Sequence, residues 1–278
     1  MKPQEYTWTR EGQELFARCW TPAEVKGVIC IAHGFAEHSA RYRHVAHFFG
    51  ARGFATLALD HIGHGMSGGK RGYTPSYDFL LDSISDVLAE AGKRFPGRPV
   101  FLWGHSMGGN LVLNYLLRRN PKEICGAIAT GPLLKLGFDP PAVKIFLAKL
   151  MRHIYPAFVE KANLDTSRLA RDPEVVKAYT SDPLVHNDMT VSLFFPLFEN
   201  GLWAIEHAGN LQQQVLLYHG SEDKLTSPEG TEAFAEKAPP AKVTFKLWPG
   251  YFHELHNEPG KDKEAVMEGM HKWMEERM

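Results

Sequence analysis

The 278-residue sequence has few cysteines, almost no net charge and no long hydrophobic run. Three cysteines are too few for a disulfide framework, and reduced thiols in a cytoplasm are expected. The net charge of −1 gives no overall electrostatic case for binding nucleic acid. The N-terminal stretch is polar and no apolar run approaches the length of a membrane span, so neither a standard secretion signal nor a transmembrane helix is expected. We therefore predict a soluble protein with a cytoplasmic location.

Short apolar runs alternate with helical patterns along most of the chain. After an antiparallel hairpin expected over 6–20, six apolar runs mostly lack the polar alternation of half-exposed strands, at 28–32, 55–60, 100–103, 127–130, 215–218 and 243–247. Strands buried on both faces have this pattern. Helical spacing occurs between them at about 42–51, 79–94, 106–119, 229–237 and 263–275. The sequence therefore predicts an α/β fold with a mostly parallel, eight-stranded sheet and helices on both faces.

Residues 137–207 break this alternation. They contain no convincing strand, and their helical segments are interrupted at Pro156, Pro173, Pro183 and Pro196. An insertion after the sixth strand can lie above the carboxyl ends of the strands, where open α/β sheets bind ligands. We predict a helical cap at 137–207 between two parts of one core, residues 1–136 and 208–278.

A nucleophile elbow is predicted at Ser106. Gly104–Gly108 matches the pattern Gly-x-Ser-x-Gly, with an apolar run before it and a helical pattern after it. Strand, sharp turn and helix expose the serine hydroxyl at a helix N-terminus, where negative charge is favoured. A second match contains Ser67, but the Gly/Pro-punctuated stretch 70–75 that follows cannot start a helix. Ser67 is therefore expected in a loop.

A serine nucleophile needs a base and a group that orients the base. Asp223 follows the seventh predicted strand and is the expected acid, with the adjacent Glu222 as its rival. His253 follows the eighth strand and is the expected general base. His256 lies three residues further on, but no clustered Cys or carboxylate set completes a metal site with it. We expect neither a metal nor a cofactor.

The oxyanion hole requires two backbone N–H groups. Met107, directly after the nucleophile, is expected to supply the first. The second is expected from Phe35, in the loop after the third strand, where Gly34 allows a close turn. His33 is interpreted as a structural histidine.

Four segments together resemble the monoacylglycerol lipase and lysophospholipase branch of the α/β-hydrolases: His33–Tyr42, Asp60–Ser67, Gly104–Gly109 and His253–His256. The resemblance implies the α/β-hydrolase fold and a serine esterase that cleaves a single long-chain acyl ester of a small polar alcohol. It also implies that Ser106, Asp223 and His253 form a catalytic triad.

The same resemblance implies that Glu37, Arg41 and His256 surround the polar end of the pocket, where glycerol would sit. The alternative is a surface Glu/Arg pair at helical spacing, which contributes little. Two positions depart from the family pattern. Phe35 is bulkier than expected in its loop, and Thr226 replaces a cysteine of the mammalian members, so acyl or headgroup preference can differ.

The leading hypothesis is hydrolysis of monoacylglycerols to free fatty acid and glycerol through an acyl-enzyme on Ser106. A lysophospholipase and a general carboxylesterase would use the same three residues, and the sequence does not separate them. A catalytically silent binding protein of this fold is the alternative from another class, although such proteins typically lack one of the three. In each catalytic case the partner is a small lipid substrate.

The stretch 141–158 adds a membrane hypothesis. Val143, Phe146, Leu147, Leu150 and Ile154 fall at helical spacing, and the basic residues among them are Lys144, Lys149, Arg152 and His153. A basic amphipathic helix can lie in a membrane interface. The alternative is that the apolar stripe packs onto the core.

Overall fold

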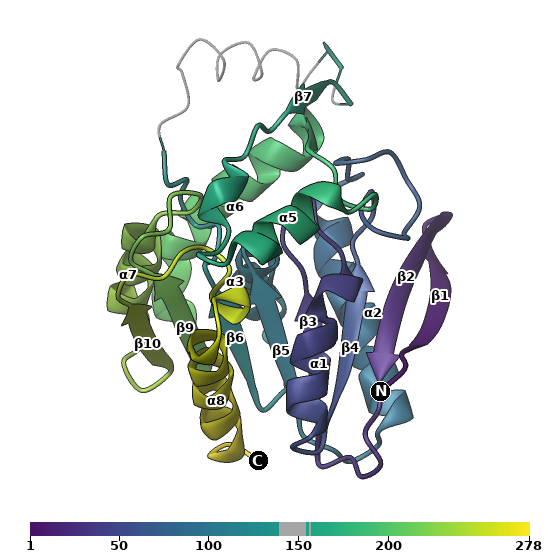
Figure 1. Ribbon diagram of the computed structural model, residues 1–278, viewed down its shortest axis with the longest axis vertical. Coiled ribbons are helices and arrows are strands. Elements are labelled where there is room, and N and C mark those ends of the chain that lie inside the picture. The colour runs from purple at the N-terminus through teal and green to yellow at the C-terminus, as the bar shows by residue number, and fades with distance from the viewer. Residues whose placement is uncertain (139–153, 156) are drawn as a thin grey trace.

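An eight-stranded sheet forms the centre of the molecule (Figure 1). The computed structural model describes residues 1–138, 154–155 and 157–278. The strands of the sheet are β1 (Gln4–Arg10), β2 (Gln13–Trp20), β3 (Gly27–Ala32), β4 (Phe54–Asp60), β5 (Val100–His105), β6 (Gly126–Thr130), β9 (Val215–Gly220) and β10 (Val243–Trp248). Their spatial order is β1-β2-β4-β3-β5-β6-β9-β10. β2 pairs antiparallel with β1 and β4 and the other pairs are parallel, which confirms the predicted sheet.

Helices cover both faces of the sheet, as the alternating sequence pattern predicts. α1 (Arg43–Gly50) and α8 (Lys261–Glu275) pack on one face. The other face carries α2 (Tyr77–Arg94), α3 (Met107–Arg119), α6 (Val191–His207) and α7 (Pro228–Lys237). In Figure 1, α1 and α8 lie in front of the sheet and α2 lies behind it.

Short 3₁₀ helices lie in the connections: η1 (Ser39–Tyr42), η2 (Thr166–Arg168), η3 (Ala208–Asn210) and η4 (Leu255–Asn257). Within the described part of the chain, no helix combines the length and apolar character needed to span a membrane.

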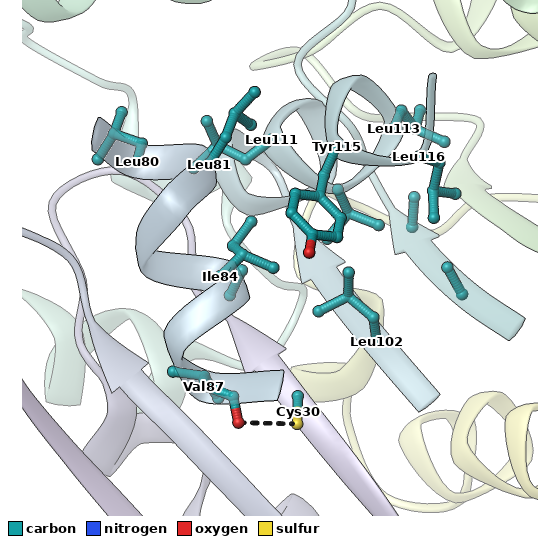
Figure 2. Close-up of a cluster of buried hydrophobic side chains, with 14 of the residues drawn as sticks. Cys30, Leu80, Leu81, Ile84, Val87, Leu102, Leu111, Leu113, Tyr115 and Leu116 are labelled. Carbon is teal, nitrogen blue, oxygen red and sulfur yellow. Dashed lines mark hydrogen bonds between the residues drawn. The ribbon is translucent and has the colours of Figure 1, made fainter. Parts of the chain in front are cut away.

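Apolar side chains fill the layer between the sheet and the helices α2 and α3 (Figure 2). The residues that these two helices contribute include Leu80, Leu81, Ile84, Val87, Leu111, Leu113, Tyr115 and Leu116. Cys30 on β3 lies under α2, with its thiol 3.9 Å from the Val87 carbonyl oxygen. Burial raises the pKa of the Cys30 thiol. Both β5 and α3 contribute buried side chains to this layer, so close packing fixes the elements on either side of the turn that joins them.

A smaller group of elements lies above the carboxyl ends of the parallel strands (Figure 1). It contains α5 (Pro173–Ser181) and an antiparallel pair of strands, β7 (Val159–Lys161) and β8 (Asp188–Thr190). The prediction that 137–207 holds no strand was therefore wrong. Three-residue strands are too short for an apolar pattern to identify them.

The prolines of this stretch have different effects. Pro173 is the first residue of α5, where its missing N–H costs nothing, and the Asp172 side chain caps the helix. Pro183 follows the end of α5. The predicted break at Pro156 lies outside the described residues.

Pro196 lies inside α6, so the predicted break at this residue was wrong. A proline here removes the hydrogen bond to the Ser192 carbonyl. The helix nevertheless continues, because Leu193 and Leu197 on either side of Pro196 are buried in the core and packing outweighs the lost bond.

Candidate active site

Ser106 occupies the sharp turn between β5 and α3. Its φ of 54° lies in the left-handed region, which is strained for a residue with a side chain. A Cβ on Gly104 would lie 2.2 Å from the Gly108 carbonyl oxygen, and a Cβ on Gly108 would lie 1.9 Å from the Ala32 carbonyl oxygen. Both glycines are therefore required for the close approach of strand and helix, as the elbow pattern predicts.

Ser67, in the second Gly-x-Ser-x-Gly match, is a buried loop residue. Its hydroxyl donates to the Asp60 carbonyl oxygen at 2.5 Å and accepts from the Phe16 N–H at 2.9 Å. These two bonds tie the loop to β4 and β2. A hydroxyl used in this way is a structural group.

The loops after β9 and β10 bring Asp223 and His253 together. The Nδ1 of His253 lies 2.6 Å from Oδ2 of Asp223, and both side chains are buried. Burial alone would lower the pKa of His253, but the Asp223 carboxylate outweighs it and raises that pKa. Burial would likewise raise the pKa of Asp223, but His253 and His219 beside it hold that pKa well below its usual range. Asp223 is therefore an ionised carboxylate that accepts a hydrogen bond from Nδ1 of His253.

The rival acid has a different environment. The Glu222 side chain is 51% exposed and pairs with the exposed Lys224 at 3.7 Å. It makes no hydrogen bond or ion pair with His253 in the described structure.

A cavity of about 280 Å³ connects these groups. Ser106 and His253 line it together with Gly34, Phe35, Glu37, His105 and Glu254. Most of the remaining wall is apolar, contributed by Leu133, Leu134, Leu136, Phe138, Leu164, Leu169, Tyr179, Met189, Val191, Phe194, Leu197, Phe198 and Leu225. The polar residues Lys135, Glu160, Lys161, Asn163, Thr190 and Thr226 also contribute to the wall. A mainly apolar cavity with some polar groups suits an amphiphilic ligand.

The loop after β3 lies directly beside Ser106. A Cβ on Gly34 would lie 3.2 Å from the Ser106 Cβ. His33 donates from Nδ1 to the Gly34 carbonyl oxygen at 2.7 Å, and in a trans peptide the N–H of Phe35 points away from that oxygen. Met107 is the first residue of α3, where a backbone N–H has no acceptor within the helix. The loop and the helix thus bring both predicted oxyanion donors close to Ser106.

Arg41 joins this loop to the histidine loop through two carboxylates. It donates to Glu37 at 2.7 Å and, with two nitrogens, to Glu254 at 2.7 and 2.8 Å. Burial opposes ionisation of both carboxyl groups, but Arg41 lowers the pKa of each. Glu37 also accepts from the Gly34 N–H at 2.6 Å and the Tyr42 hydroxyl at 2.8 Å. The network fixes the loop that carries Phe35.

The three predicted headgroup residues differ in position. Glu37 lines the cavity, whereas Arg41 and His256 are not among the described residues that line it. His256 stacks on Tyr42 at 5.2 Å and lies 4.9 Å from the His105 ring, and burial holds its pKa well below the usual range. These contacts put Arg41 and His256 behind the cavity wall.

Sequence reasoning missed Glu254 as a site residue. Its place between His253 and His256 was a signal that went unused, because nothing in the sequence reveals its partner Arg41, 213 positions away.

Comparison with known proteins shows the family to which the chain belongs. Residues 23–260 match the family described as serine aminopeptidase, S33. A monoacylglycerol lipase of Mycolicibacterium smegmatis is 34% identical over 265 residues, covering 95% of this chain and 93% of that protein. An uncharacterised abhydrolase domain-containing protein of Dictyostelium discoideum is 33% identical over 97% of this chain, but the chain spans only 28% of its length.

Among solved structures, a monoacylglycerol lipase of Paleococcus ferrophilus superposes with a TM-score of 0.85 at 30% identity, covering 100% of both chains. The chain therefore belongs to the serine aminopeptidase S33 family of α/β-hydrolases, and it is a carboxylic ester hydrolase similar to the monoacylglycerol lipases.

Proposed function

We propose that the protein hydrolyses monoacylglycerols to a free fatty acid and glycerol, with Ser106 as nucleophile, His253 as general base and Asp223 as the acid that orients it. In this mechanism Ser106 attacks the ester carbonyl as His253 takes its proton. His253 then protonates the departing glycerol, and water releases the fatty acid from the acyl-enzyme by the same steps. The N–H groups of Phe35 and Met107 stabilise the tetrahedral oxyanion.

We infer the preferred substrate from the charge at the polar end of the cavity. Glu37 and Glu254 line it as two carboxylates, and a single guanidinium, that of Arg41, neutralises them in part. Lys135, Lys161 and Glu160 also line the cavity, but the two carboxylates at its polar end disfavour the phosphate of a lysophospholipid relative to an uncharged alcohol. The apolar wall accommodates one acyl chain.

Hydrolysis of a substrate panel tests this proposal. We expect monoacylglycerols to be cleaved with a higher kcat/KM than lysophospholipids, diacylglycerols and p-nitrophenyl esters of the same acyl length. Preference for a lysophospholipid would refute the charge argument. Equal rates on all esters would indicate a general carboxylesterase.

The activity is expected to rise with pH along a limb whose midpoint lies above about 6.5, the ordinary histidine value. His253 must be neutral to accept the Ser106 proton, and Asp223 raises the pKa of His253, so the neutral form appears only at higher pH. The kcat/KM for a p-nitrophenyl ester as a function of pH measures the limb. A midpoint below 6.5 would contradict the raised pKa of His253, and activity that does not depend on pH would contradict its role as base.

Glu37, Arg41 and His256 are proposed to set headgroup selectivity, with Arg41 and His256 acting through the groups that face the cavity. In Glu37→Gln and His256→Phe, we expect monoacylglycerol hydrolysis to fall about tenfold more than hydrolysis of a p-nitrophenyl ester, which lacks glycerol. Glu24→Gln, at an exposed glutamate, is the matched control and should change neither rate. Equal losses on both substrates would make these residues purely structural.

Residues 137–207 are proposed as the cap between the core segments 1–136 and 208–278, and its outer surface as a membrane contact. Val143, Phe146, Leu147 and Leu150 lie outside the described residues, but Phe138, Ile154, Tyr155 and Phe158 are 41–67% exposed. The Lys70 ammonium lies 5.7 Å from the Tyr155 ring and supplies positive charge beside these apolar groups. Apolar side chains next to a cation suit an anionic lipid surface.

Sedimentation with anionic liposomes tests the contact. We expect salt-sensitive binding that Ile154→Glu and Phe158→Glu weaken several-fold while hydrolysis of a soluble short-chain ester is kept. Met278→Glu, at the opposite end of the molecule (Figure 1), should bind like the wild type. Wild-type binding by Ile154→Glu and Phe158→Glu would show that this surface is not the membrane contact.

A further inference from the structure

A second histidine lies behind the catalytic acid. His219, at the end of β9, is completely buried, and its Nε2 lies 3.1 Å from Oδ2 of Asp223. This is the same carboxylate oxygen that contacts Nδ1 of His253. Asp223 is thus held between two imidazole rings, only one of which the proposed mechanism uses.

The neighbours of His219 determine which of its nitrogens carries the proton. An ionised carboxylate only accepts hydrogen bonds, so the contact with Asp223 requires a proton on Nε2. In the neutral ring Nδ1 is then an acceptor, and it lies 2.7 Å from Oγ1 of Thr231 on α7, whose hydroxyl can donate. Thr231 is itself completely buried. The pair is therefore built to hold one tautomer of His219 with its N–H directed at Asp223.

The other contacts of Asp223 use its remaining acceptor positions. The Thr226 hydroxyl lies 2.9 Å from Oδ2, and the backbone N–H groups of Leu225 and Thr226 donate to Oδ1 at 2.8 and 3.0 Å. Backbone donors fix Oδ1, while side chains alone fix Oδ2. The direction of Oδ2, and with it the orientation of the His253 ring, therefore depends on side-chain donors such as His219.

We propose that His219 is a positioning residue of the esterase, which holds Oδ2 of Asp223 in line with Nδ1 of His253 and shares the negative charge of that oxygen. The inference rests on the proposed function, in which His253 is the base. A donor that shares the carboxylate charge reduces the attraction between Asp223 and protonated His253. His219 thus limits how strongly Asp223 raises the pKa of His253, which keeps more of the base neutral near pH 7.

Other titratable and charged groups also surround His253. The His105 ring lies 4.7 Å away, and the carboxylates of Glu254 and Glu37 raise the pKa of His253 beside the larger effect of Asp223. Among the described residues, none of these three groups makes a hydrogen bond, ion pair or ring contact with His219. A change at His219 therefore reaches His253 through Asp223 and through the Thr226 hydroxyl, whose oxygen lies 3.3 Å from both His219 Nε2 and His253 Nδ1.

The first test is an NMR measurement on the wild-type protein with ¹⁵N-labelled histidine. Two-bond ¹H–¹⁵N correlations of the His219 ring should show the tautomer with the proton on Nε2. A proton on Nδ1 alone would overturn the proposal, because Nε2 could not then donate to Asp223. This measurement needs no substrate, so it stands even if the protein does not hydrolyse monoacylglycerols.

The second test compares three variants. His219→Leu removes the donor and should raise the pKa of His253 by roughly one unit, move the acid limb of kcat/KM up equally, and lower kcat about tenfold. His219→Gln keeps an N–H donor and should stay within about twofold of the wild type. Thr231→Val keeps the His219 ring but removes the hydroxyl that selects its tautomer. A smaller increase in the pKa of His253 is expected.

The outcomes separate a positioning role from a space-filling one. A folded His219→Leu with an unchanged pKa of His253, or a His219→Gln as impaired as His219→Leu, would refute the proposal. If His219→Leu does not fold, Thr231→Val and His219→Gln decide, because wild-type values in Thr231→Val would then refute it. Failure of the proposed function would look different: monoacylglycerols would not be the preferred esters, while the NMR titration of His253 would still respond to His219.

Discussion

Ser106→Ala is expected to lower kcat about 10⁴- to 10⁶-fold without unfolding the protein. Removal of the hydroxyl abolishes the acyl-enzyme, and the residual rate comes from the oxyanion donors and substrate binding, which remain. The turn itself should persist, because the close approach of Gly104 and Gly108 and the buried layer around α3 define it. Steady-state kinetics and a thermal melting curve measure the two quantities separately.

Covalent labelling identifies the nucleophile independently of turnover. A fluorophosphonate should modify the peptide that carries Ser106 and leave Ser106→Ala unlabelled. Ser67→Ala is the matched control from the second motif. It removes two buried hydrogen bonds, so it should cost about 1–3 kcal/mol of stability while the folded fraction keeps its turnover. An adduct on Ser67 instead would show that Ser67, and not Ser106, is the nucleophile.

The central strands of the sheet could be predicted from the sequence because they are buried on both faces. A run such as Gly27–Ala32 is fully buried and therefore apolar throughout, which marks a central parallel strand. The elbow was predictable for a related reason. A side chain at either glycine would collide with the backbone of a neighbouring segment. This requirement for glycine gives a recognisable pattern within five residues.

The remaining features depend on contacts between distant segments, which leave no local pattern. In the sequence, Arg41 and Glu37 look like a surface pair at helical spacing. In the structure, Glu254 from the loop after β10 also pairs with Arg41, and the guanidinium is largely buried. His219 stands four residues before Asp223, yet only the fold of that loop turns its ring onto the same carboxylate. No sequence periodicity or motif predicts either of these contacts.

Asp223→Asn is expected to lower kcat by roughly 10⁴ while the fold is retained. Both carboxylate oxygens act only as acceptors: Oδ1 for the backbone N–H groups of Leu225 and Thr226, and Oδ2 for His253 among its side-chain donors. Asparagine must replace one of them by an NH₂ group, which is a donor. Backbone N–H groups cannot turn away, so the amide oxygen is expected to take the Oδ1 place and the NH₂ group to face His253.

An amide donor in that position reverses the tautomer of the base. It donates to Nδ1 of His253, which moves the ring proton to Nε2, the nitrogen that must accept the Ser106 proton. The base is then present but blocked, which explains a large loss of turnover in a folded protein. Steady-state kinetics on a p-nitrophenyl ester measure the loss, and Glu222→Gln, at the exposed neighbouring carboxylate, should leave kcat unchanged. Near-normal activity of Asp223→Asn together with a large loss in Glu222→Gln would transfer the acid role to Glu222.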